Sequence, residues 1–452
     1  MLNPQNPESE SGRGTKTLHL CVALLFAATL SVPSVYAATT ITVQNTGDGV
    51  ANAANCPGSG CRLRDAIAAA RNGDTIDFSV TGTISVIRDG FIVGRNITIS
   101  GPGAANLAIK GARSAVFFVG TDKTVTISGL TITNGAGLDG GGIVNDRSAL
   151  RVFNCVLKNN KANGDGGAIA NSARYGTRAT LIVSGCTFSN NSAQTGGAIS
   201  NSNFAGDNAT VSVTFSTFDH NTARQDGGGI CNRSLHSAGA TVTVSNSTFS
   251  RNVVGQVCCS GRGGGIYNYA ASGSPATVQI INSTFSDNST MRFGDGGGIY
   301  NTGEAGNASV SISNSTFSGN TAGGGGGSIH NFGMGATATL INTIFNAQTG
   351  PSIQNQRGNV TSGGYNLSSD IGGGVLTGPG DQINTDPKLG PLQNNGGPTD
   401  THALLSGSPA INAGDPHFDP NAFDPPLIDD QRGGFYARVV NDRIDIGAFE
   451  VQ

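Results

Sequence analysis

The side chains that could take part in chemistry stand at fixed positions beside a repeated motif, Gly-Gly-(Ala/Gly/Ser)-Ile-x-Asn. Its seven copies begin at Gly140, Gly166, Gly196, Gly227, Gly263, Gly296 and Gly326. In the last three copies the residue after the Ile is Tyr267, Tyr300 or His330. Because this position is expected to face outward, the three rings could form a strip on which sugar rings stack. The alternative is that they pack against neighbouring loops.

The residue before each Gly pair is often charged. In chain order these residues are Asp139, Asp165, Thr195, Asp226, Arg262, Asp295 and Gly325. Asp139 and Asp165 would carry like charges on adjacent repeats, which is tolerable if they share Ca²⁺ or point apart into solvent. They are also the candidates for catalysis, since a glycosidase needs paired carboxylates. Because polar corner residues forming a weak ion ladder explain the pattern equally simply, no catalytic residue, metal ligand or cofactor is assigned.

Four cysteines fall into two expected pairs. Cys56 and Cys61 close a short segment, and a disulfide is expected between them in an oxidising compartment. Cys155 and Cys186 stand at equivalent positions of successive repeats. They would therefore be stacked neighbours that can form a second disulfide.

Three further cysteines belong to one repeat. Cys231 could bridge to Cys258 or Cys259, which would leave one thiol free. A zinc site is the alternative, but His236 is the one histidine close to them in the sequence, so a metal is disfavoured.

The elements that must position these residues recur at intervals of 26 to 36 residues. Between the Gly motifs lies a second motif, Phe or Leu followed three residues later by Asn. Its pairs are Leu157/Asn160, Phe188/Asn191, Phe218/Asn221, Phe249/Asn252, Phe285/Asn288 and Phe317/Asn320. Two motifs in phase with a period near 30 indicate a solenoid of stacked coils. Equivalent residues would then form ladders, with Ile and Phe inside and Asn at bends.

Between the motifs, segments such as 240–245 alternate apolar and hydroxyl side chains, and β-branched residues are frequent. This period of two is typical of strands, and no helical period appears in the repeats. The predicted fold is all-β, a right-handed parallel β-helix solenoid with about three strands in each coil.

Both ends of the solenoid are expected to be capped. Residues 38–100 are predicted to form an N-terminal cap, in which an amphipathic helix over residues 64–71 covers the open end. Residues 101–350 would form the β-helix. Residues 351–452 are richer in Pro and lack the ladder motifs, so we expect an irregular C-terminal cap.

The N-terminus predicts export. Residues 1–37 combine Arg13 and Lys16 with an apolar run from Leu18 to about Leu30 and a small-residue cleavage site ending at Ala37. No later segment is long and apolar enough to span a bilayer. Charged residues make up 12% of the chain and the net charge is −3, which gives no indication of nucleic-acid binding.

Three regions resemble known families. The run Cys61-Arg-Leu-Arg-Asp-Ala-Ile67, followed by Gly73–Phe78 and Gly82–Ile84, resembles the CSLREA domain that heads many secreted bacterial β-helix proteins. Arg62 and Asp65 replace the Ser and Glu of that family. The C-terminal part resembles the choice-of-anchor Q region of exported bacterial proteins through six blocks: 364–368, 386–392, 395–399, 408–411, 430–433 and 445–450.

The repeats themselves resemble those of chlamydial polymorphic outer-membrane proteins, which carry Gly-Gly-Ala-Ile and Phe-x-x-Asn. Those proteins are surface adhesins, and the fold implied is the pectin-lyase-like β-helix. Polysaccharide lyases of that fold cluster acidic Ca²⁺ ligands with a basic residue on one face, whereas the acids here are spread thinly.

The resulting hypothesis is a secreted or cell-surface β-helix with a binding or structural role, in adhesion or glycan contact. The first alternative is a polysaccharide lyase or glycoside hydrolase on the same scaffold, and the second is a passive envelope or matrix component. The sequence does not indicate the ligand, the mode of attachment or the oligomeric state.

Overall fold

The computed structural model describes residues 37–174, 176–204, 207–236, 238–255 and 261–452. The expected signal peptide, apart from Ala37, lies outside the described residues, and so do Cys258 and Cys259. Contacts divide the chain into two units, 1–37 and 38–452, and the second holds the fold. Within the described residues, no helix has the length and apolar character needed to cross a membrane.

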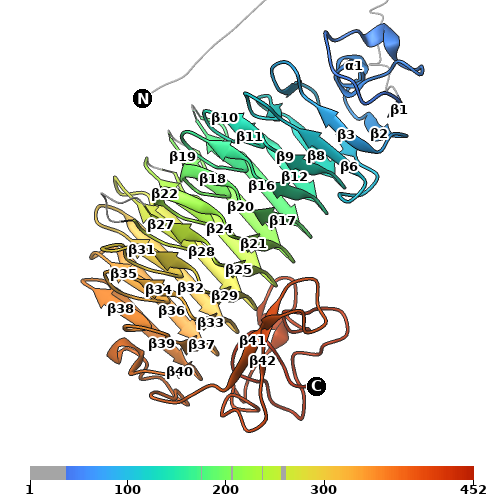
Figure 1. The fold of residues 1–452 in the computed structure, drawn as a ribbon. Coiled ribbons are helices and arrows are strands. Elements are labelled where there is room, and N and C mark those ends of the chain that lie inside the picture. Colours follow the sequence, from blue (N-terminus) through green and yellow to red (C-terminus); the bar gives the residue numbers. More distant parts are fainter. Residues whose placement is uncertain (1–36, 175, 205–206, 237, 256–260) are drawn as a thin grey trace, which may run out of the picture. The chain divides into compact units, whose positions relative to one another are not determined.

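Each regular coil contains four strands. One such coil consists of β11 (Ile143–Asp146), β12 (Ala149–Phe153), β13 (Val156–Lys158) and β14 (Lys161–Ala162). Every strand pairs in parallel with its counterpart in the next coil, so Ile143 lies beside Ile169 and Leu157 beside Phe188. The chain is therefore a right-handed parallel β-helix, as predicted (Figure 1). The prediction of three strands per coil was wrong, because a short fourth strand runs into each Gly pair.

A twelve-stranded sheet forms one side of the stack. Its inward residues are Val, Ile or Leu and its outward residues are mostly Thr and Ser, which is the expected period of two. Its strands are β1 (Thr40–Val43), β2 (Thr75–Phe78), β5 (Thr98–Ser100), β8 (Thr124–Ser128), β12, β16 (Ala179–Ser184), β20 (Ala209–Thr214), β24 (Ala240–Ser245), β28 (Pro275–Ile281), β32 (Asn307–Ser313), β36 (Ala336–Ile341) and β39 (Asn359–Gly364).

An eleven-stranded sheet carries the Phe ladder. Its strands are β3 (Gly82–Ser85), β6 (Leu107–Lys110), β9 (Thr131–Thr133), β13, β17 (Thr187–Ser189), β21 (Thr217–Asp219), β25 (Thr248–Ser250), β29 (Thr284–Ser286), β33 (Thr316–Ser318), β37 (Ile344–Asn346) and β40 (Leu367–Ser368). Phe188, Phe218, Phe249, Phe285 and Phe317 are fully buried, and neighbouring rings stack with centres 4.4–4.7 Å apart. The predicted inward ladder is thus present.

Two further sheets complete the coils. The ten-stranded sheet contains β4 (Phe91–Val93), β7 (Phe117–Val119), β11, β15 (Ile169–Ala173), β19 (Ile199–Asn203), β23 (Ile230–Ser234), β27 (Ile266–Ala270), β31 (Ile299–Thr302), β35 (Ile329–Phe332) and β38 (Ile353–Gln356). The seven-stranded sheet contains β10 (Ala136–Gly137), β14, β18 (Ser192–Thr195), β22 (Thr222–Asp226), β26 (Val253–Val254), β30 (Ser289–Thr290) and β34 (Thr321–Ala322). Strands of the stack thus continue beyond residue 350.

Two columns of Asn amides run along the stack, and every member except Asn355 is buried. In the column from Asn145 to Asn355, each Nδ2 donates to the Oδ1 of the next Asn at 2.6–2.9 Å. In the column from Asn160 to Asn320 the same bonds measure 2.8–3.1 Å. These bonds satisfy polar groups that burial would otherwise penalise.

The Gly pairs are required by the corner that precedes the ten-stranded sheet. Gly166, the first residue of its pair, has φ +67°, a left-handed conformation that favours Gly. A Cβ on Gly167, the second residue, would lie 2.1 Å from the carbonyl oxygen of Gly197 in the next coil. Backbones of adjacent coils therefore approach too closely there for any side chain.

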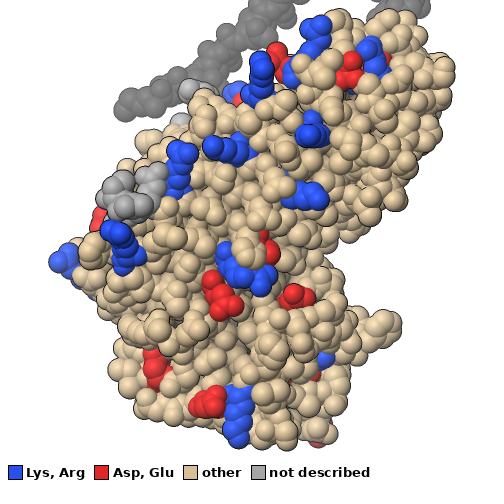
Figure 2. Space-filling view, viewed as in Figure 1, with Lys and Arg blue, Asp and Glu red and all other residues tan. Residues whose placement is uncertain are grey.

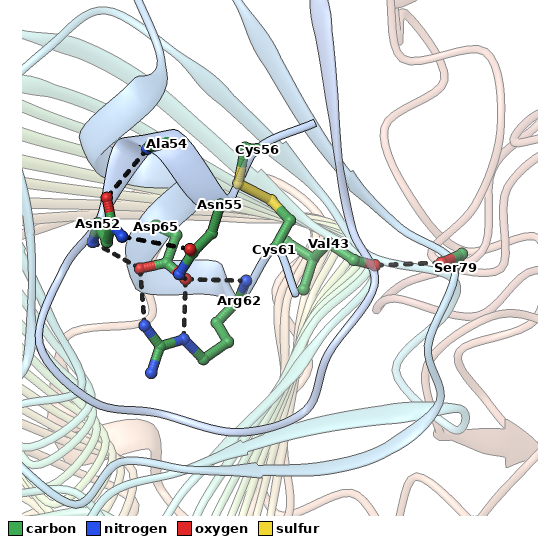
Figure 3. Close-up of a disulfide and its surroundings, with 9 residues drawn as sticks. All are labelled: Val43, Asn52, Ala54, Asn55, Cys56, Cys61, Arg62, Asp65 and Ser79. Carbon is green, nitrogen blue, oxygen red and sulfur yellow. Dashed lines mark hydrogen bonds and ion pairs between the residues drawn. A yellow bond between two sulfur atoms is a disulfide. The ribbon is translucent and has the colours of Figure 1, made fainter. Parts of the chain in front are cut away.

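The N-terminal cap contains α1 (Leu63–Ala69), a disulfide between Cys56 and Cys61, and a central carboxylate (Figure 3). Asp65 accepts hydrogen bonds from Asn52 N at 2.7 Å, Asn55 Nδ2 at 3.0 Å and Arg62 Nε at 2.8 Å. Burial alone would raise the pKa of Asp65, but these bonds lower it to about 2. The carboxylate thus ties the disulfide loop to the start of the helix.

The C-terminal region folds back along the side of the stack. It contains η2 (Gly372–Gly374), η3 (Pro420–Ala422) and an antiparallel pair, β41 (Leu389–Gln393) and β42 (Thr401–Leu404), which Figure 1 shows beside the eleven-stranded sheet. Outward Thr residues of β25, β29 and β33 bond to it: Thr248 Oγ1 donates to Asp400 O at 2.6 Å, and Thr316 Oγ1 accepts from Ala448 N at 3.0 Å. We expected this region to cap the lower end, but residues 389–452 cover a lateral face instead.

A buried ionic network stabilises the C-terminal region. Arg432 Nη2 lies 2.6 Å from Asp430 Oδ2, and its guanidinium lies 3.8 Å from the ring centres of Tyr436 and Phe449. Glu450 accepts the backbone N–H of Asp445 at 2.9 Å. Burial raises the pKa of Glu450 to about 8, against the attraction of the fully buried Arg438.

Candidate functional site

The aromatic column lies on the outer side of the ten-stranded sheet but is not exposed. Register places Tyr267, Tyr300 and His330 on adjacent strands, with ring centres 5.9 and 5.0 Å apart. Their exposed fractions are 3%, 4% and 2%. Tyr269 and Phe332, two residues further along their strands, pack against them. The predicted sugar-stacking strip was therefore wrong, since bulky outward neighbours shield one another.

Charged side chains surround this column. Arg233 on β23 reaches back two coils to Asp165, with Nη2 and Oδ2 2.9 Å apart and both side chains about one-fifth exposed or less. The hydroxyl of Thr195 also donates to Asp165. Cys231 lies fully buried next to this pair, and burial raises the pKa of its thiol. Asp165 therefore acts as the acceptor at the centre of a compact polar cluster.

The second part of the cluster centres on Asp226 and Arg262, which pair at adjacent backbone positions. Burial raises the pKa of Asp226 to about 6, although the cations of Arg262 and Arg233 oppose the shift. The guanidinium of Arg262 lies 5.7 Å from the ring centre of Tyr300. Burial raises the pKa of Tyr300 to about 12, so this phenol stays protonated at neutral pH.

A third acid, Asp295, lies at the C-terminal end of this group of charged residues. Asp295 follows Arg262 in the backbone register, and its Oδ1 lies 3.3 Å from Nδ1 of His330. The two atoms are close but not aligned as a hydrogen bond, and both ring nitrogens of His330 lack a hydrogen-bond partner among the described residues. Asp295 keeps 27% of its side-chain surface exposed. The acid–arginine column, defined as Asp165, Asp226, Arg233, Arg262 and Asp295, thus combines buried and accessible groups.

The pair proposed for Ca²⁺ or catalysis is arranged differently from the expectation. Asp139 uses Oδ1 to accept the backbone N–H of Asp165 at 2.9 Å, while the carboxylate of Asp165 is occupied by Arg233 and Thr195. The two acids therefore have separate partners. Among the described residues, no group of three or more His, Cys, Asp or Glu side chains is placed to hold a metal ion.

Three cysteines in the part of the chain that the structure describes are free thiols. Cys155 and Cys186 are stacked neighbours as expected, but the disulfide predicted between them is absent. Each thiol instead donates to the carbonyl two residues earlier, at 3.3 Å. Ser216 Oγ makes the same contact at 2.8 Å in the next coil, so the two cysteines continue a hydroxyl ladder.

Cys231 is also free and buried, which contradicts the bridge expected from it to Cys258 or Cys259. Those two cysteines lie outside the described residues.

The sequence reasoning missed Arg233 and named Thr195 without giving it a role. It treated Asp226, Arg262 and Asp295 as an ion ladder of little net energy. Asp165 and Arg233 are 68 residues apart, and their contact requires a long side chain to cross an intervening coil. The detectable signal was that charged residues recur immediately before successive Gly pairs.

Comparison with known families supports the repeat resemblance. The model for the Chlamydia polymorphic membrane protein (Chlamydia_PMP) repeat matches residues 154–172, 185–202 and 215–233. These segments run from the strands of the eleven-stranded sheet, through the Gly corner, into the ten-stranded sheet. No curated protein is similar enough in sequence to be matched. The CSLREA and choice-of-anchor Q resemblances stay predictions.

Several solved structures are similar in fold. Pectate lyase Pel9A is 15% identical with a TM-score of 0.44, covering 93% of this chain and 98% of its own. XylC in complex with xylose is 9% identical with a TM-score of 0.29, covering 72% and 56%. A mannuronic acid specific polysaccharide family 6 lyase from human gut microbiota is 13% identical with a TM-score of 0.28, covering 68% and 86%. At these values the likeness carries no conclusion about activity.

Proposed function

We propose that this chain is an exported, cell-surface or extracellular protein whose β-helix is a rigid scaffold for binding glycans. The observation that supports the proposal is the acid–arginine column. In a chain with only 12% charged residues, five of them are gathered within five successive coils of one outer face, and the coil that contributes none of them places Thr195 in the same column. Carboxylate and guanidinium groups are planar hydrogen-bonding groups that suit sugar hydroxyls and carboxylates. The family resemblances support a surface location.

Binding would use the polar groups and not the aromatic rings. Asp165, Arg233 and Asp295 keep 16%, 21% and 27% of their side-chain surface exposed, whereas Tyr267 and Tyr300 are buried beneath them. The rings then serve as an apolar base, and Tyr300 holds Arg262 in place through a cation–π contact.

A glycan and polysaccharide array probed with the purified protein, with and without Ca²⁺, tests the proposal. We expect binding that is lost in Arg262→Gln with Asp295→Asn. The matched control is Arg251→Gln with Asp219→Asn, which removes an ion pair of 2.7 Å from the eleven-stranded sheet. Equal binding by the two double variants would exclude the acid–arginine column as the site. No binding to any glycan would leave the passive envelope or matrix role.

A second candidate function is a polysaccharide hydrolase or lyase at the same column, and Asp226 favours it. With a pKa of about 6, Asp226 can hold or release a proton near neutral pH, as a general acid must. Asp165 and Asp295 each lie two strand spacings from it in the register, about 9.6 Å along the stack, comparable with the carboxyl separation in inverting glycosidases.

The same array, read for new reducing or unsaturated ends, distinguishes the two functions. Polymer cleavage that disappears in Asp226→Asn, while binding remains, would establish an enzyme. Binding without release of ends, in both the parent protein and Asp226→Asn, would establish the binding role.

A further inference from the structure

A second charged surface lies near the N-terminal end of the stack. A groove of about 750 Å³ is lined by Arg88, Lys110 and Arg113, together with Asp89. All three cations are exposed. None of their side chains makes an ion pair or hydrogen bond with another described residue. The three cations are therefore not engaged in contacts within the described part of the chain and can bind a ligand.

Two more lysines extend this surface along the coil axis. In the eleven-stranded sheet, Lys110 pairs with Thr133, and Thr133 pairs with Lys158. The two lysines therefore occupy one outward column, about 9.6 Å apart. Lys161 follows at the start of β14 and is also exposed. We call Arg88, Lys110, Arg113, Lys158 and Lys161 the basic strip.

The charge of the chain is divided along the stack. Residues 38–161 hold twelve Lys and Arg against eight Asp and Glu, whereas residues 162–452 hold twelve against nineteen. On the face shown in Figure 2, blue side chains predominate over the N-terminal coils and red ones are more frequent towards the C-terminal coils. The basic strip therefore lies in a region of net positive charge. The summed field of that region attracts anions over longer distances than a single ion pair does.

The C-terminal region leaves this surface open. It covers the outward face of the eleven-stranded sheet from β25 to β33, where the outward Thr248, Thr284 and Thr316 are buried. Further towards the N-terminus, Lys158 on β13 is exposed. An extended ligand can therefore lie along the uncovered coils β6 to β13 without displacing any part of the chain.

We propose that the basic strip binds an acidic polysaccharide, one with carboxylate or sulfate groups along an extended chain. Cations two coils apart suit charges that recur with a disaccharide, and the hydroxyl of Ser85 lies in the same groove to meet sugar hydroxyls. No aromatic side chain lines the groove, whereas single-stranded nucleic acids are usually held by stacking on aromatic rings. This surface is separate from the acid–arginine column, and the inference does not depend on the proposed function.

The test measures affinity of the purified protein for polygalacturonate and dextran sulfate, with neutral dextran for comparison. Binding should require the charged polymers and weaken as salt rises, because exposed charge pairs are screened. The triple variant Lys110→Gln, Arg113→Gln, Lys158→Gln should bind about ten-fold more weakly, since exposed ion pairs contribute modestly and together.

The matched control is Arg151→Gln, Arg178→Gln, Arg224→Gln, which removes the same charge from other exposed positions. An equal loss in this control would show a net-charge effect and overturn the strip. Duplex DNA or anionic phospholipid vesicles provide the comparison of ligand class. If the protein bound either of these more tightly than polygalacturonate and dextran sulfate, and the triple variant of the basic strip lost that binding, the assignment to a polysaccharide would be overturned. The double variant Arg262→Gln, Asp295→Asn should still bind polygalacturonate, which would show that the basic strip binds independently of the acid–arginine column.

Discussion

The buried Asn column predicts a large effect for a small change, Asn221→Ala. Asn221 Oδ1 accepts the backbone N–H and Nδ2 of Asn191 at 3.1 and 3.0 Å. Its Nδ2 donates to Phe188 O at 3.0 Å and to Asn252 Oδ1 at 2.9 Å. Truncation removes all four bonds.

Part of this loss is compensated in the folded state. Asn191 Nδ2 keeps Leu157 O at 2.9 Å, and Asn252 Oδ1 keeps the backbone N–H of Asn221 at 3.1 Å. The Asn191 N–H and the Phe188 carbonyl each lose their side-chain partner in the dry interior. At about 1–3 kcal/mol for each such group, the free energy of unfolding should fall by about 4 kcal/mol.

Urea unfolding followed by circular dichroism measures this change, with Thr222→Ala as the control. Thr222 is the next residue in the chain and is exposed, so its truncation should change the free energy by less than about 1 kcal/mol. Hydrogen exchange should show faster exchange at the Asn191 amide in Asn221→Ala and not in the control. Equal midpoints for the two variants, with an unchanged Asn191 amide, would refute the hydrogen-bond account of the column.

Three other predictions concern pH and the cap. The folded-state pKa of Asp226, about 6, lies above its reference value of 3.8, so the folded state binds more protons than the unfolded state between those pH values. The free energy of unfolding should therefore fall as pH rises from about 4 to about 6. Urea titrations of Asp226→Asn should show a smaller dependence of this free energy on pH. The pKa of Glu450 is likewise raised, from 4.5 to about 8, so its contribution to the free energy of unfolding should also fall as pH rises between those values. Residues 430–450 should then exchange amide hydrogens faster at higher pH than intrinsic exchange accounts for, and Glu450→Gln should remove this extra increase. Replacing both Cys56 and Cys61 with Ser should destabilise the N-terminal cap by about 2 kcal/mol, measured as increased tryptic cleavage after Arg62 relative to the parent protein.

The interior of the stack was predictable because its residues repeat with few changes, such as Leu157 in the Phe ladder. A buried Phe or Asn must meet its equivalent in the next coil, so the spacing in the sequence specifies the register, as Phe218 beside Phe249 shows. Short strands lack this redundancy. β14 consists of Lys161 and Ala162 alone, and two residues carry no detectable period, which is why the fourth strand was missed.

The outer face was harder to predict, because outward does not mean exposed. Tyr267 and Tyr300 do face away from the interior, yet the size of Tyr269, Phe332 and Arg262 buries them. The disulfide predicted between Cys155 and Cys186 was wrong for a related reason. The backbone geometry of stacked strands suits a disulfide, but a local carbonyl offers each thiol the hydrogen bond that serine makes in other coils.

The direction of the Asn bonds has a consequence for how such a protein can change in length. In both columns every bond between two Asn side chains runs from Nδ2 to the Oδ1 of the next coil towards the C-terminal end. Oδ1 of Asn145, the first member, has no partner among the described residues. Inserting or deleting one complete coil leaves each amide with a donor on one side and an acceptor on the other. A fractional insertion would place mismatched groups in contact. Lengthening by duplication should therefore proceed in whole units of about 30 residues, each adding its amide dipoles to the same unidirectional array.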